Sequence, residues 1–160
     1  MLMLNLNSPS EVLVDKQSIN AKRRARKFAL QALYQWSMTG QDLYEIEAQF
    51  RAANSMERVD TDYFCNILYG VPKHLETLET GIIAYLDRPI KDLNPVELSV
   101  MRLGAFELWH CLEIPYRVVL DESVSLAKEF GSQDGHRYVN GILNKVARVA
   151  RALEIGLENE

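Results

Sequence analysis

The sequence predicts an all-α protein of six or seven helices arranged in two small packed bundles. Apolar residues recur every three or four positions along most of the 160 residues, which is the spacing of a helix face. The alternation of apolar and polar residues that is typical of strands is almost absent. The connections between the periodic stretches are short, and short connections favour neighbouring helices that pack antiparallel.

Three helical patterns are predicted in the first half of the chain. The first starts at about Asn20 and ends near Gly40, because glycine commonly terminates helices. The second is shorter and begins after Asp42, whose side chain is a good N-cap. The third is long and contains Pro72. A proline lacks an N–H and its ring crowds the carbonyl of the preceding turn, so we expect a kink or break at residues 70–72.

A clear helix start follows in the second half of the chain. Asn94 can cap a helix, and Pro95 suits the first helical position. Glu97 can reach back to the amide of Asn94 and complete a capping box. This helix runs to about Cys111 and is apolar on two sides, which predicts a buried central helix.

Two further helices complete the predicted fold. One spans about residues 117–130 and is closed by Gly131. The last begins near Ser132 or Asp134, and its buried stripe is expected to extend to Leu153.

We expect one helical domain at residues 20–155, divided into sub-bundles at about 20–87 and 92–155. Residues 1–19 mix isolated Leu and Val with Asn, Ser and Pro, which predicts a flexible or loosely docked extension. Residues 156–160 are predicted to form a short tail.

Charge is distributed unevenly along the chain. Residues 16–41 contain six Lys or Arg and no acid, so the other 12 of the 18 cations face all 22 acids and sum to minus ten. A local positive field on an acidic body attracts polyanions to one surface and repels them elsewhere. This asymmetry is typical of a protein that confines a nucleic acid to one face.

The cations of the first helix are predicted to share a face with an aromatic ring. At about 100° per residue, this face lies opposite the apolar stripe. Lys and Arg neutralise phosphates and Tyr can stack on unpaired bases, which favours single-stranded RNA as the ligand. This hypothesis requires cations that are exposed and free of carboxylates; a lipid surface or simple solvation is the alternative. The face contains Arg23, Arg26, Lys27, Leu30 and Tyr34.

The start of the last helix is a second candidate. Asp134 is followed by His136, Arg137 and Tyr138 before the apolar stripe begins. Free amides at a helix N-terminus can receive a phosphate, and Arg137 or Tyr138 could hold a backbone or a base. Asp134 would oppose an anion there, and ordinary capping and packing is the alternative interpretation.

Enzymatic, metal and membrane functions have no support in the sequence. The histidines fall in no metal-ligand spacing, and phosphate-loop, nucleophile-elbow and dinucleotide motifs are absent, so we expect no enzyme, metal or cofactor. Glu107 lies between apolar residues and is expected to be a paired acid or an acid at the edge of the apolar surface, not a general base. Cys65 and Cys111 are expected to be reduced, packed thiols. Without a long apolar run or a secretory signal, the protein is expected to be cytoplasmic.

Four stretches resemble the NusB family of bacterial transcription antitermination factors, in order and from about Lys22 to Arg148. They are KRRARKFALQALYQW, NPVELSVMRLGAFEL, IPYRVVLDESVSLAKEFG and HRYVNGILNKVAR. The resemblance implies a non-catalytic adaptor that binds the boxA element of nascent ribosomal RNA transcripts. It also implies pairing with NusE, a ribosomal protein of the small subunit, within an antitermination complex on RNA polymerase.

The resemblance further implies site residues. The NusE-facing acid corresponds to Glu97, which can also complete the capping box only if its carboxylate stays partly exposed. The extension before Asn20 departs from the family pattern and could cover the basic segment. A homodimer of the free protein through the partner surface is also considered, and a helical module whose basic helix binds an acidic protein is the alternative function. The implied RNA-binding residues are Lys22, Arg23, Arg24, Arg26, Tyr34, Asp134, Arg137 and Tyr138.

Overall fold

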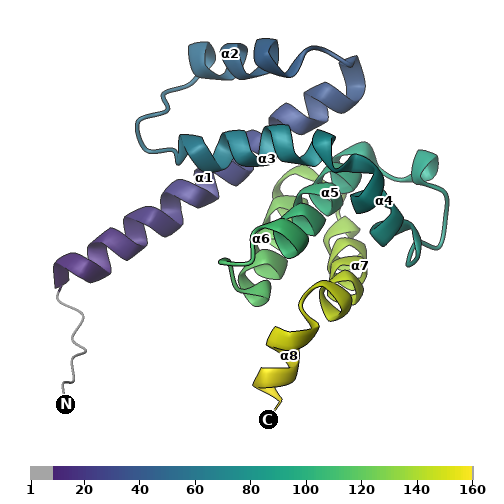
Figure 1. The fold of residues 1–160 in the computed structure, drawn as a ribbon. Helices are drawn as coiled ribbons and strands as arrows, with labels where there is room; N and C mark the ends of the chain where they lie inside the picture. Colours follow the sequence, from purple (N-terminus) through teal and green to yellow (C-terminus); the bar gives the residue numbers. More distant parts are fainter. Residues whose placement is uncertain (1–8, 160) are drawn as a thin grey trace, which may run out of the picture.

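The computed structural model describes residues 9–159, and the side chains of residues 15–159 within them. This part of the chain consists of helices and connections and contains no strand (Figure 1). The all-α class is therefore confirmed, with eight α-helices in the described residues where six or seven were predicted. The elements are α1 (Pro9–Thr39), α2 (Leu43–Ala53), α3 (Thr61–Lys73), α4 (Leu75–Ile83), the 3-10 helix η1 (Ile90–Asp92), α5 (Pro95–His110), α6 (Tyr116–Phe130), α7 (Gly135–Ala150) and α8 (Ala152–Glu158).

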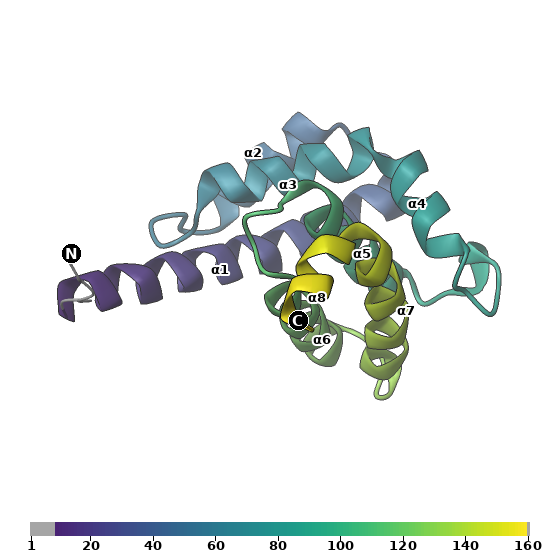
Figure 2. The same cartoon turned by 60° about the horizontal axis from the view of Figure 1, so that its bottom comes forward.

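The first helix starts earlier than predicted. It begins at Pro9 instead of near Asn20, and its N-terminal part projects beyond the rest of the molecule (Figure 2). Proline suits a helix start because its fixed φ is helical and its missing N–H is not needed there. The basic segment, residues 22–27, thus lies in the middle of a long helix. The dipole of the helix end has little effect on charges there. Residues 1–8 of the predicted extension lie outside the described residues.

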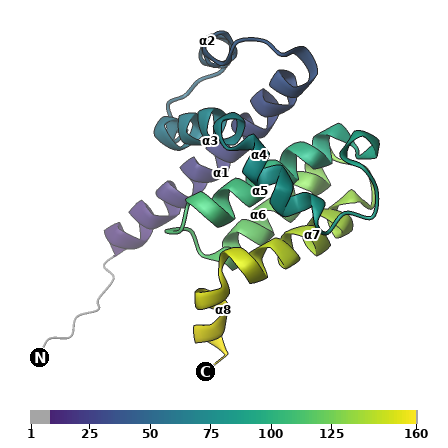
Figure 3. The same cartoon turned by 45° about the vertical axis from the view of Figure 1, so that its right-hand side comes forward.

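The predicted central helix is α5, which packs against most of the other helices. It contacts α1, α3, α4, α6 and α7, and Val100, Met101, Leu103 and Leu108 on it are fully buried. Helix α1 lies between α2 and α3 on one side and α5 on the other (Figure 3). Helix α4 packs on α5 and α7. The division into sub-bundles at 20–87 and 92–155 stays a prediction.

The long third pattern is divided into α3 and α4, as expected, but the break lies at His74 instead of residues 70–72. Pro72 is accommodated in the last turn of α3, and the N–H of His74 still donates to the carbonyl oxygen of Gly70 at 3.0 Å. A methyl group on Gly70 would lie 2.4 Å from Cζ of Phe106. Glycine at this position therefore allows α3 to approach α5 closely.

The predicted caps are confirmed in two cases. The side chain of Asp42 accepts a hydrogen bond from the amide of Tyr44, and the side chain of Asn94 accepts bonds from the amides of Val96 and Glu97. These bonds satisfy amides that the first turn of a helix leaves without partners.

The prediction that Leu153 is buried is wrong, because α7 ends before it. The chain turns at Arg151, and Leu153 is 87% exposed on α8. The side chain of Arg151 is buried and donates to the carbonyl oxygens of Glu107, Leu108 and Cys111 at the end of α5. A cationic donor suits the C-terminal end of a helix, where the carbonyl oxygens carry a partial negative charge.

Within residues 9–159, no helix combines the length and the apolar composition needed to cross a bilayer.

Candidate nucleic-acid interface

Arg26 is buried, so its predicted position on an exposed RNA-binding face is wrong. It is 3% exposed, and its Nε donates to both carboxylate oxygens of Glu107 at 2.9 and 3.0 Å. The hydroxyl of Tyr63 donates to the same carboxylate, and the guanidinium lies over the ring of Tyr63. Glu107 is 0% exposed, which confirms it as a paired acid.

The position of α1 between two layers explains this burial. An exposed helix has one apolar stripe, but α1 is covered by α2 and α3 on one side and by α5 on the other. Arg26, Leu30 and Leu33 follow each other at helical spacing on the buried side toward α5. The predicted basic face is therefore divided, and only its outer part reaches solvent.

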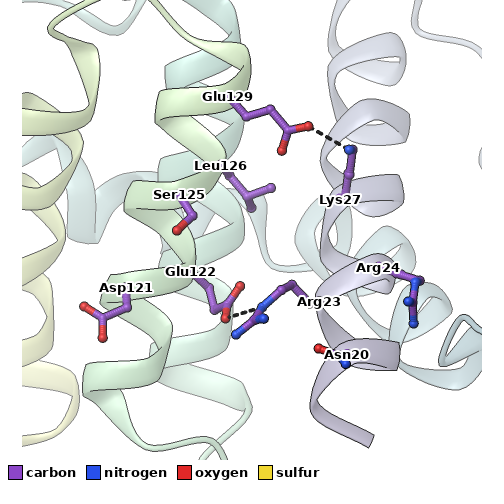
Figure 4. A pocket seen from close by; sticks show the side chains of 9 residues that line it. All are labelled: Asn20, Arg23, Arg24, Lys27, Asp121, Glu122, Ser125, Leu126 and Glu129. Carbon is purple, nitrogen blue, oxygen red and sulfur yellow. Dashed lines mark hydrogen bonds and ion pairs between the residues drawn. The ribbon is translucent and has the colours of Figure 1, made fainter. Parts of the chain in front are cut away.

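Two cations of α1 face α6 across a groove of about 580 Å³ (Figure 4). Nε of Arg23 lies 2.9 Å from Oε1 of Glu122, and Nζ of Lys27 lies 2.6 Å from Oε1 of Glu129. The side chain of Arg23 is 58% exposed and that of Lys27 is 46% exposed. Both cations are thus accessible but paired, so the prediction that they are free of carboxylates is wrong.

The opposite flank of α1 carries a second groove, also of about 580 Å³, between α1 and the segment before α3. Lys22 pairs with Asp60 at 2.9 Å and is half-buried. Arg24 is exposed and donates weakly to the carbonyl oxygen of Arg58 at 3.4 Å, with no carboxylate partner among the described residues. Arg58 also lines this groove, and sequence reasoning missed it because it lies far from the basic segment among acids.

Exposed ion pairs such as Lys27–Glu129 contribute little free energy, about 0–1 kcal/mol, because water and salt screen them. A phosphate offers the same charge and oxygen acceptors as a carboxylate. A nucleic acid can therefore replace these carboxylates at a small cost. Arg23 is bound more firmly, because Glu122 is itself buried.

Tyr34 lies two turns beyond Lys27 on α1, about 10 Å along the helix axis. Its side chain is exposed, as predicted, and no described side chain hydrogen-bonds to its hydroxyl. An exposed phenol ring at this distance from a cation can stack on a base whose backbone follows the groove.

The second predicted segment opens α7. Asp134 and Arg137 are exposed, but the side chain of Asp134 makes no cap hydrogen bond. Tyr138 is half-buried: its hydroxyl donates to Oδ1 of Asp87 at 2.8 Å, and the guanidinium of Arg88 lies 5.0 Å from its ring centroid. Hydrogen bonds from Arg88 and then Tyr138 lower the pKa of Asp87 to about 2. One face of the Tyr138 ring is thus already covered by a cation.

The structure does not join the two segments directly. Among residues 15–159, the side-chain hydrogen bonds of the basic segment reach α5, α6 and residues 58–60, whereas those of Tyr138 reach residue 87.

Glu97 does not occupy the position predicted for it. It is 7% exposed, and its Oε2 accepts hydrogen bonds from the amide and hydroxyl of Ser132, both at 2.8 Å. The prediction of a capping box with Asn94 is wrong, because the carboxylate turns toward α6 and α7 instead. A direct contact of Glu97 with a protein partner stays a prediction, and the partial exposure that it required is not present.

Other reactive groups form no centre in the described residues. Within residues 15–159, no three His, Cys, Asp or Glu side chains gather in a way that could hold a metal ion. The rings of His74 and His110 stack with centroids 4.2 Å apart, and burial, together with His74, lowers the pKa of His110. Cys65 and Cys111 are free thiols, as predicted.

Comparison with known proteins gives consistent matches. The model of the NusB family matches residues 23–148. The transcription antitermination protein NusB of Legionella pneumophila (strain Corby) is 65% identical over 147 residues, which cover 92% of this chain and 100% of that protein. A solved structure of T. maritima NusB has a TM-score of 0.69 at 28% identity and covers 79% of this chain and 90% of its own. A solved complex of antitermination factors NusB and NusE with dsRNA matches with a TM-score of 0.72 at 23% identity over 81% of this chain and 98% of its own, which supports the fold.

Proposed function

The chain belongs to the NusB family, and on this premise we propose that it is a transcription antitermination protein that binds boxA-type RNA of nascent ribosomal RNA transcripts. It does so together with NusE and contributes to an antitermination complex on RNA polymerase. The observation that carries the proposal is the 65% identity, over the full length of the relative, with a protein of that name. We also propose that the chain acts in the cytoplasm by binding alone, without catalysis or a cofactor.

The outer surface of α1 supports this proposal. Arg23, Arg24 and Lys27 are exposed along the helix, with Tyr34 beyond them. RNA phosphates would replace the carboxylates of α6 on Arg23 and Lys27, while a base stacks on the phenol ring. Asp134, Arg137 and Tyr138 would contact a further part of the RNA, with Asp134 reducing the affinity. Arg26 has no part in this mechanism, because it is buried.

One observation favours a different partner. Besides the buried Arg26, which binds Glu107, three cations of the basic segment already bind carboxylates of this chain: Lys22, Arg23 and Lys27. An acidic protein segment could occupy the same positions. The second candidate function is therefore a helical module that binds an acidic protein through α1.

A binding experiment distinguishes the two functions. Affinities for a boxA-type RNA, a scrambled RNA of equal composition and an RNA duplex are measured by fluorescence anisotropy across a salt series, with and without purified NusE. We expect preference for the boxA-type strand and tighter binding when NusE is present. Because coupling between two ligands is reciprocal, the RNA should tighten NusE binding by the same factor. Equal affinity for all RNAs under every condition would contradict the proposal.

The carboxylates of α6 compete with RNA in this mechanism, which leads to a prediction. Replacing them in Glu122→Gln/Glu129→Gln is expected to raise the affinity for RNA about three- to tenfold, because two like charges leave the groove and two cations are released. Anisotropy titrations at about 0.1 M salt measure this change. The control is Glu154→Gln/Glu158→Gln on α8, which removes equal charge outside the groove and should change the affinity by less than about twofold. No gain over this control would show that the carboxylates do not restrict access.

A further inference from the structure

We propose that Glu97 is a positioning residue that fixes the turn between α6 and α7 and, through it, the start of α7. This inference rests on the proposed function only where it concerns RNA, since Asp134, Arg137 and Tyr138 all follow this turn. Glu97 itself is buried in the first turn of α5 and is therefore not offered as an RNA contact.

The start of α7 lacks the cap that usually fixes a helix. Asp134 occupies the N-cap position without a side-chain hydrogen bond to the first turn. The turn is held instead at Ser132, two residues before Asp134. There Oε2 of Glu97 accepts hydrogen bonds from both the amide and the hydroxyl of Ser132, each at 2.8 Å. Hydrogen bonds to a charged acceptor are stronger than neutral ones. The acceptor Glu97 is buried, whereas the donor Ser132 is exposed. Glu97 thus anchors the residues just before α7 to α5, although it does not bind the first-turn amides of α7 themselves.

Two glycines enclose the Glu97 carboxylate. A methyl group on Gly135 would lie 2.2 Å from both Cδ and Oε2 of Glu97, and one on Gly131 would lie 2.9 Å from Oε2. Neither glycine has a positive φ, so the need for glycine here is one of space and not of backbone conformation. The side chain of Glu97 therefore occupies the space beside both glycines, and a larger residue at either position would have to displace it.

Tyr138 is held from a second direction. It lies one turn along α7, with its hydroxyl bonded to Asp87 and its ring beneath Arg88. Glu97 fixes the beginning of the helix and Asp87 fixes this ring, so the exposed Arg137 between them has a defined position. A ligand that uses this segment binds more tightly when the segment is in place beforehand, because the apparent affinity falls with the fraction of competent molecules.

A set of variants of the full chain tests this inference. Glu97→Ala removes the acceptor, whereas Glu97→Gln keeps one oxygen that can accept both bonds from Ser132. We expect amide hydrogen exchange of residues 132–138 to become at least about tenfold faster in Glu97→Ala and to change less than about threefold in Glu97→Gln. The affinity for boxA-type RNA is expected to fall about five- to tenfold in Glu97→Ala and to stay within about twofold in Glu97→Gln. Circular dichroism confirms that each variant is fully folded during the titration.

Gly135→Ala supplies an independent test, because its methyl group must displace the carboxylate. It should accelerate exchange in the same residues as Glu97→Ala, while in Glu97→Ala/Gly135→Ala the second change should add little. Additive effects of the two substitutions, or unchanged exchange in Glu97→Ala, would overturn the positioning role. If exchange responds as expected and wild-type protein does not bind the RNA, the proposed function fails and the positioning role stands. If exchange responds and only the RNA affinity of the variants is unchanged, the link from Glu97 to RNA is overturned.

Discussion

Arg26→Met is expected to lower the free energy of unfolding by about 3–5 kcal/mol, because it leaves the buried carboxylate of Glu107 without its cation. Arg26 donates to both oxygens of this carboxylate, and neither residue has appreciable contact with water. Urea denaturation followed by circular dichroism measures the change. The matched control is Arg24→Met, which makes the same substitution on the exposed flank of the same helix. Its free energy of unfolding is expected to change by no more than about 0.5 kcal/mol.

The loss of folding stability in Arg26→Met should depend on pH. Burial already raises the pKa of Glu107 above its usual range, against the opposing effects of Arg26 and the Tyr63 hydroxyl, and removal of Arg26 raises it further. A carboxyl group whose pKa is higher in the folded state loses stability as the pH rises from its unfolded value, about 4.3, through its folded value. The variant is therefore expected to be less destabilised at pH 5 than at pH 8.

A second substitution separates the charge from the packing. In Arg26→Met/Glu107→Gln the buried charge is gone, while the amide oxygen can still accept the hydrogen bond of Tyr63. Most of the lost stability should return, and its dependence on pH should disappear. Because Arg26 is buried, this variant should also keep its RNA affinity within about twofold, as for a residue that makes no phosphate contact. A large loss of RNA affinity in the folded variant would restore Arg26 as an RNA contact.

Local patterns were sufficient to predict the helices and most of their ends. The all-α class, the caps at Asp42 and Asn94 and the buried central helix depend on residues close together in the sequence, and the structure confirms them. Periodicity also separated the buried stripe of α1 from most of its polar side. It could not show that α1 is covered on two sides, because that depends on where α5 lies.

The errors at Arg26 and Glu97 have the same physical cause. Each charged side chain had a plausible local role, and each instead binds a partner distant in sequence: Glu107 for Arg26, and Ser132 for Glu97. The free energy of such a contact is set by burial and tertiary geometry, which helical spacing does not contain. The family resemblance assigned these residues to binding surfaces but could not show which side chains reach the surface. In the structure Arg23 and Arg24 are exposed, whereas Arg26 and Glu97 are buried.

Arg23→Gln/Arg24→Gln is expected to lower the affinity for boxA-type RNA at least about tenfold at 0.1 M salt, through the loss of two phosphate contacts from the outer surface of α1. Glutamine is chosen because it can keep a hydrogen bond to the buried Glu122, which limits the effect on the fold. Anisotropy titrations provide the affinities, and the free energy of unfolding should fall by no more than about 1 kcal/mol.

The salt dependence identifies the cause of this loss. Each phosphate contact to a single strand contributes about 0.7 to the slope of log affinity against log salt, so the variant's slope should be smaller by about 1.4. The matched control is Lys145→Gln/Arg148→Gln, which removes two exposed cations from α7. A merely global electrostatic attraction would be reduced equally by both changes, because they alter the net charge by the same amount. Equal losses of RNA affinity in the two variants would therefore show that RNA is attracted by the overall charge of the protein and not by contacts on α1. If Arg23→Gln/Arg24→Gln instead retains its RNA affinity and loses an acidic protein partner, the second candidate function is favoured.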